Sequence, residues 1–114
     1  MIRKKSEMRN ETRQNMRGGI GDTSISHMFE ANELLNKARF AGYITVPVGG
    51  SIGYHVHDTD AEIIIVSSGK ACAVENGISY ELNVGDTMFT GGGASHSFEN
   101  IGDTPLTLIG IVIN

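Results

Sequence analysis

The sequence contains a single cysteine, Cys72, among its 114 residues. One cysteine excludes an intrachain disulfide, and a chain of this length can bury a core without one. The sequence also lacks any run of apolar residues long enough to cross a membrane, and no apolar secretory segment follows its basic start. We therefore expect one cytoplasmic domain with no membrane partner.

Positive charge is scarce over most of the chain. The formal net charge of −4 does not indicate nucleic-acid binding. Residues 1–20 carry six Lys or Arg and two Glu, whereas the remaining chain carries three basic and eleven acidic groups. We assign residues 1–22 to a polar N-terminal arm, which is either a solvated, partly frayed terminus or a segment lying across an acidic partner subunit. Residues 23–114 form the expected barrel domain.

Helical patterns are almost absent as well, and the only candidate is a short helical turn near residues 30–36. The rest of the chain alternates between β-rich segments and glycine-containing turns, and Asn76-Gly77 is the strongest hairpin signal. The strands are expected at 23–29, 39–48, 51–57, 62–67, 71–75, 78–82, 87–90, 95–98 and 106–113. This pattern predicts an all-β sandwich or barrel.

Histidines and one glutamate are placed as metal ligands would be. His55 and His57 are two residues apart, so on an extended strand their side chains leave the same face. Glu62 opens an apolar run, where a buried carboxylate is costly unless a charge compensates it. His96 follows a glycine-rich turn and supplies a third imidazole. The four side chains suit one divalent ion such as Mn, Fe, Co, Ni or Zn, and an ion that prefers six ligands keeps about two positions open.

The same residues resemble the paired motifs of the cupin superfamily over roughly residues 40–112. In the second motif Gly91 stands where proline is usual. The resemblance implies a double-stranded β-helix, or jelly-roll barrel, with a bound metal. The matching positions are Gly49, His55, His57, Glu62 and Gly69 in the first motif, and Gly85, Gly93, His96 and Asn100 in the second.

The barrel interior offers candidates for a substrate pocket. Alternate side chains of a small barrel point inward, so Phe98 shares a face with His96 if His96 is a ligand. By the same parity we expect Gly42, Ile44, Leu108 and Gly110 near the site. The two glycines either leave open volume beside the metal or mark bends in curved strands.

The sequence leaves the reaction open. The resemblance implies a metal-dependent enzyme, dioxygenase-like, decarboxylase-like or an isomerase, acting on a small carboxylate, keto acid or sugar-derived substrate. The alternative is a non-catalytic metal-dependent module that binds a sugar or organic acid. No catalytic residue stands out apart from the loop candidates Asp58 and Asp60. Small cupins dimerise through sheet edges, and the apolar run 63–66 suits this, so we expect a homodimer.

Overall fold

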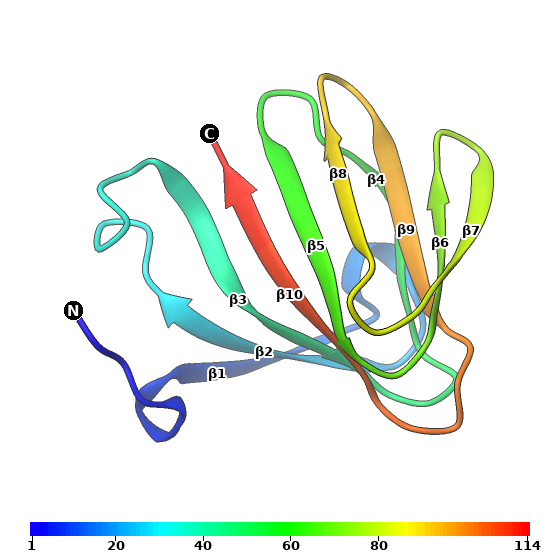
Figure 1. Ribbon diagram of the computed structural model, residues 1–114, viewed down its shortest axis with the longest axis horizontal. Coiled ribbons are helices and arrows are strands. Elements are labelled where there is room, and N and C mark those ends of the chain that lie inside the picture. The colour runs from blue at the N-terminus through cyan, green and yellow to red at the C-terminus, as the bar shows by residue number, and fades with distance from the viewer.

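Two antiparallel sheets face each other across a hydrophobic interior in the computed structural model, which describes residues 1–114 (Figure 1). The six-stranded sheet has the order β1-β2-β3-β10-β5-β8, and the four-stranded sheet has the order β4-β9-β6-β7. The strands are β1 (Arg9–Gln14), β2 (Asp22–Phe29), β3 (Ala38–Val46), β4 (Ser51–Val56), β5 (Ala61–Ser68), β6 (Ala71–Glu75), β7 (Ile78–Leu82), β8 (Thr87–Gly91), β9 (Ser95–Asn100) and β10 (Leu106–Ile113).

This arrangement is the expected all-β, double-stranded β-helix. All the strands predicted from the sequence are present as β2 to β10, within a few residues at their ends. Asn76 and Gly77 both have positive φ, at 48° and 82°, and join β6 to β7 in a two-residue hairpin. The helical elements are 3-10 turns of three residues, η1 (Lys5–Glu7) and η2 (Met16–Gly18), and no helix is long and apolar enough to span a membrane.

Alternation along the strands sets the core. On β10 the buried positions alternate with half-buried ones, so Leu106 and Leu108 point inward whereas Ile109 and Ile111 point outward. The inward side chains of both sheets pack together as one apolar cluster. Its members are Ile44, Val46, Ile52, Ile64, Val66, Ala71, Ala73, Phe98, Leu106 and Leu108.

The polar N-terminal arm contains structure that the sequence did not predict. Residues 9–14 form β1, which pairs with β2 so that Arg9 lies opposite His27 and Gln14 opposite Asp22. In Figure 1 β1 lies at the outer edge of the six-stranded sheet. Only one of its residues, Glu11, is even half-buried, so β1 shows no alternation of apolar and polar residues. A strand that is polar on both faces gives no period-2 signal, and hydrogen bonding to β2 decides its structure.

Two smaller features also depend on tertiary context. Residues 31–36 form successive turns, with the Leu34 N–H bonded to the Glu30 carbonyl at 3.1 Å, and left-handed Leu35 and Asn36 end the segment. The apolar run 63–66 lies in β5, between β10 and β8. The expectation that this run forms a sheet edge at which two chains pair is therefore wrong.

Candidate metal centre

The four predicted ligand residues meet inside the barrel from three strands. His55 lies on β4, His57 directly follows it, Glu62 lies on β5 and His96 on β9. His55 and His96 are direct partners in the pairing of β4 with β9. One potential ligand atom from each of the four residues lies within 4.8 Å of the other three.

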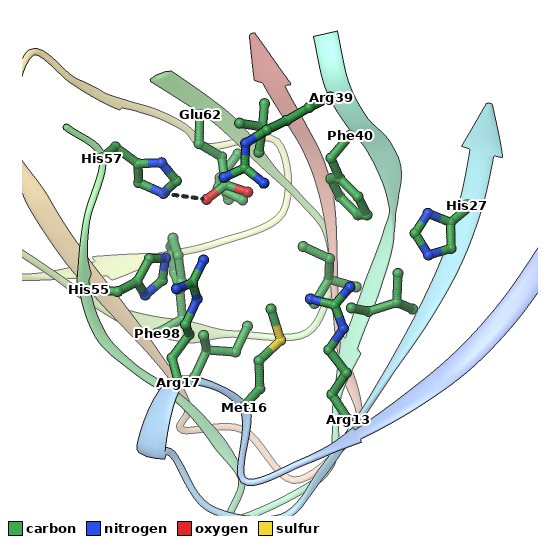
Figure 2. A pocket seen from close by; sticks show the side chains of 15 residues that line it. Arg13, Met16, Arg17, His27, Arg39, Phe40, His55, His57, Glu62 and Phe98 are labelled. Carbon is green, nitrogen blue, oxygen red and sulfur yellow. Dashed lines mark ion pairs between the residues drawn. The ribbon is translucent and has the colours of Figure 1, made fainter. Parts of the chain in front are cut away.

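The separations between the ligand atoms are short. The Nε2 atom of His96 lies 3.0 Å from that of His55 and 3.1 Å from that of His57. The Glu62 Oε1 atom lies 3.1 Å from His96 Nε2. It also lies 3.3 Å from His57 Nε2, the pair marked by the dashed line in Figure 2. The four side chains therefore point at one common centre.

The other ring nitrogen of each histidine has its own partner. His55 Nδ1 donates to the Gly53 carbonyl at 2.7 Å, and His57 Nδ1 donates to Asp60 at 2.7 Å. His96 Nδ1 lies 2.9 Å from the Thr90 hydroxyl. Because a carbonyl and a carboxylate only accept hydrogen bonds, neutral His55 and His57 keep their protons on Nδ1 and present Nε2 lone pairs to the centre.

The Thr90 hydroxyl completes the same arrangement for His96. It lies 3.4 Å from Glu75 Oε2, so it can donate to that carboxylate while accepting from His96 Nδ1. Thr90 and His96 are both essentially buried, at 1% and 0% exposed. These two hydrogen bonds orient the His96 ring so that its Nε2 atom faces the centre, as in His55 and His57.

The donor set fits a divalent cation. Nitrogen lone pairs 3.0–3.1 Å apart repel unless positive charge lies between them. Glu62 is only 7% exposed, and its carboxylate has no lysine or arginine partner. Both features are resolved by one ion bound to all four groups.

Electrostatics keep the site ready for a metal. Burial lowers the pKa of His55 to about 4, and the positive charge of Arg17 acts in the same direction, so His55 is neutral at pH 7. For Asp60, burial alone would raise the pKa, but hydrogen bonds from His57 and Arg39 outweigh it and lower the pKa below its usual value. Asp60 thus remains a carboxylate that can hold the His57 Nδ1 proton.

A cavity of about 150 Å³ opens beside the cluster, and His55, His57 and Glu62 line it, whereas His96 does not. Of the predicted pocket residues, Ile44 and Phe98 line it, and the Phe98 ring lies 4.7 Å from that of His96. Leu108 is fully buried in the apolar core and does not line the cavity.

Gly42 and Gly110 do not line the cavity either, because neighbouring side chains occupy the space beside them. They are direct partners in the pairing of β3 with β10. A Cβ at Gly110 would lie 2.9 Å from Ile44 Cδ1 and 3.3 Å from Glu62 Oε2, and one at Gly42 would lie 2.8 Å from the Phe40 ring. Gly110 therefore leaves space for Ile44 and for the candidate ligand Glu62, and Gly42 leaves space for the Phe40 ring in the cavity wall.

Gly91, the departure from the second motif, has a similar cause. It pairs with Ala61 where β8 meets β5, and a Cβ there would lie 2.6 Å from the Ala61 Cβ. The close approach of these strands at the start of the Glu62 strand favours glycine at this position.

The structure adds cavity residues that the sequence did not identify. Arg13 and Met16 from the N-terminal arm, with Arg17 and Arg39, line the same cavity as the ligands (Figure 2). The excess of basic residues in the arm was the available signal, but it did not show that the arm folds back over the barrel.

His27, the histidine outside the two motifs, also lines this cavity. It is 7% exposed and its Nε2 lies 2.5 Å from Glu11 on β1. Its ring packs edge-on against Phe40, with the centroids 5.4 Å apart. Hydrogen bonds from Arg13 and then His27 lower the pKa of Glu11 to about 2, so Glu11 is a carboxylate at neutral pH.

The chain is a double-stranded β-helix in which three histidines and one glutamate form a cluster that could hold a metal ion. The chain belongs to the cupin family, because the cupin domain model matches residues 42–113. That match spans β3 to β10 and all four ligand residues.

Known relatives agree with this assignment. The chain is 35% identical over 113 residues to a protein of Thermotoga maritima named oxalate-binding protein, covering 99% of this chain and 93% of the relative. A crystal structure of a predicted oxalate decarboxylase from the same organism superposes with a TM-score of 0.95 at 35% identity, covering 99% of this chain and 98% of the other. An uncharacterized double-stranded β-helix protein of Klebsiella pneumoniae has a TM-score of 0.69 at 27% identity, covering 78% and 74%.

Proposed function

We propose that this protein binds a divalent metal ion through His55, His57, Glu62 and His96 and uses it to hold a small carboxylate, with oxalate as the first candidate. The observation that carries this proposal is the convergence of the four ligand atoms beside an arginine-lined cavity. The name of the Thermotoga relative supports the choice of oxalate.

The cavity suits a small anion. Its volume of about 150 Å³ accommodates a molecule of only a few heavy atoms. Arg13, Arg17 and Arg39 line it, whereas Glu62 is the only carboxylate among its lining residues. A bound divalent ion would act as a Lewis acid and would add positive charge at the inner end. Carboxylate oxygens are hard donors that both guanidinium groups and such ions bind well.

Isothermal titration calorimetry tests the binding proposal. We expect oxalate to bind the manganese-loaded protein, and we expect no binding after the metal has been removed with a chelator and the chelator dialysed away. Glucose serves as a neutral control of similar polarity. Binding of oxalate that is equal with and without metal, or no binding at all, would contradict the proposal.

Catalysis on the bound carboxylate is the second candidate, and His27 is the observation that favours it. Decarboxylation replaces a carbon–carbon bond with a carbon–hydrogen bond, so it needs a proton donor. Asp60 is engaged by His57 and Arg39, and Asp58 does not line the cavity. His27 lines the cavity, its Nε2 lies against the Glu11 carboxylate, and its Nδ1 has no partner within the protein. Because Glu11 accepts the Nε2 proton, the donor form would be the imidazolium, which also carries a proton on Nδ1. Conversion of oxalate to carbon dioxide and formate by the wild type but not by His27→Gln would establish this activity, with the proton from His27 ending on the formate carbon.

A further inference from the structure

The three arginines of the cavity differ in what they bind. Arg39 is paired with Asp60 at 2.6 Å, and Arg13 donates to Glu11 at 2.8 Å. The Arg17 guanidinium makes no hydrogen bond and no ion pair with any residue of the protein. Arg17 therefore offers the one cavity guanidinium whose full donor set is available to a ligand.

The backbone of Arg17 is held in an unusual conformation. Arg17 has φ 56° and ψ 27°, in the left-handed region that residues with a side chain rarely adopt. Such strain persists only where surrounding contacts enforce it, and it occurs most often at functional sites.

The contacts that enforce it are close approaches between the arm and β4. A Cβ at Gly53 would lie 2.0 Å from the Arg17 carbonyl oxygen, and one at Gly19 would lie 2.1 Å from the Ser51 carbonyl oxygen. Ser51 also donates its N–H to the Ile20 carbonyl at 2.8 Å and accepts the Ile20 N–H on its hydroxyl at 2.9 Å. Glycine at both positions lets the two backbones touch, which fixes the start of the Arg17 side chain.

This contact also places Arg17 next to the ligand strand. Gly53 lies against the Arg17 carbonyl, and the Gly53 carbonyl oxygen accepts a hydrogen bond from His55 Nδ1. Figure 2 shows the Arg17 guanidinium beside His55, projecting into the cavity from the arm. The free guanidinium and the metal ligands thus border the same small space.

We propose that Arg17 is the specificity-determining residue of this site, and that its guanidinium binds the carboxylate oxygens of the small substrate held at the metal centre. The inference rests on the proposed function and adds the residue that recognises the substrate. A guanidinium presents parallel N–H donors that match a carboxylate in a two-point contact, which a lysine ammonium does not reproduce.

The test compares oxalate binding to manganese-loaded Arg17→Gly, Arg17→Lys and wild type by calorimetry, with the metal content checked for each. Glycine adopts left-handed φ without cost, so Arg17→Gly removes the guanidinium and leaves the loop at least as stable. Arg9→Gln is the matched control, because it removes a positive charge from the same arm outside the cavity.

We expect Arg17→Gly to weaken oxalate binding at least about tenfold, as for the loss of one charge-assisted contact, with manganese affinity unchanged. Arg17→Lys should recover only part of this loss. Arg9→Gln should bind within about twofold of wild type, because Arg9 does not line the cavity and its exposed charge is screened by solvent. If the wild type binds oxalate and Arg17→Gly binds it within twofold of the wild-type affinity, the role of Arg17 is overturned while the proposed function stands. Absence of wild-type binding would overturn the proposed function and this inference with it.

Discussion

His57 donates its Nδ1 proton to Asp60 across 2.7 Å, and Asp60 also accepts from Arg39 on the surface of the barrel. Asp60 was a candidate for an alternative ligand or a base at the cavity mouth. Its carboxylate is instead committed to orienting a ligand, with its Oδ1 atom on His57 and its Oδ2 atom on Arg39.

We predict that Asp60→Asn weakens divalent metal binding by about 10- to 100-fold, because an amide orients the His57 ring less firmly than a carboxylate does. Asp58→Asn is the matched control, since Asp58 is exposed on the same loop and makes no hydrogen bond. Competition titrations with a fluorescent chelator measure both affinities. Equal affinities for the two variants would show that Asp60 does not position His57.

Gly110→Ala tests the close packing behind Glu62. The new methyl group would lie 2.9 Å from Ile44 Cδ1 and 3.3 Å from Glu62 Oε2, so both side chains must move. We expect a loss of about 1–3 kcal/mol in the free energy of unfolding, as for overpacking in a core, together with weaker metal binding. Gly102→Ala controls for loss of glycine alone, because Gly102 does not have a left-handed φ and its new methyl group would lie 3.5 Å or more from its nearest neighbours. A Gly110→Ala protein with wild-type metal affinity would mean that Glu62 has room to adjust.

The sequence indicated which four candidate ligand side chains come together, because that signal is local. His55 and His57 share a face by strand parity. The two motifs supply Glu62 on β5 of the facing sheet and His96 on β9, which pairs with β4. The strands β2 to β10 followed from their alternation and turns. Both kinds of information lie within short stretches of the chain.

The cavity wall was not predictable in the same way. Arg17 and His27 reach the cavity only because β1 pairs with β2 and η2 packs against β4, and both are long-range contacts of a polar segment. Gly42 and Gly110 had the predicted inward direction, but the space beside them depends on Phe40, Ile44 and Glu62. Side-chain direction follows from parity, whereas free volume depends on all neighbours together.

The Glu11 carboxylate predicts a pH dependence for the attachment of the arm. Its pKa falls to about 2 in the folded protein from an ordinary value of 4.5. Because the folded-state pKa is the lower one, Glu11 stabilises the fold above pH 4.5, and that contribution is lost as the pH falls towards 2. We expect Glu11→Gln to destabilise the metal-free protein by about 1–2 kcal/mol at pH 7, after allowance for solvent screening.

Urea denaturation of the metal-free wild type and Glu11→Gln at several pH values measures this difference. The gap between the two proteins should shrink steadily between pH 4.5 and pH 2, since protonation turns Glu11 into a neutral group like glutamine. A gap that stays constant over this range would show that the Glu11 charge is not what attaches β1.

The outer face of the six-stranded sheet has a row of apolar side chains, and we predict that it forms the interface of a homodimer. Ile63, Ile111 and Phe89 are cross-strand neighbours on β5, β10 and β8, and Phe89 is 60% exposed. Such an apolar stripe on a sheet face is typical of an interface between protein chains. We expect light scattering to give a dimer and Phe89→Lys to shift it towards monomer, whereas Val48→Lys, at an exposed loop position, should not. A wild-type monomer at all concentrations would contradict the prediction.

Elemental analysis of protein purified without chelators measures whether the four converging side chains bind a metal ion. We predict about one divalent transition-metal ion per chain in the wild type and little or none in His55→Ala. Circular dichroism should show the same β fold for both proteins, because His55 is a ligand and contributes no apolar packing to the core. A wild type that carries no metal and takes up none from solution would show that the four side chains do not form a metal site. A His55→Ala protein with undiminished metal would show that the ion is bound elsewhere.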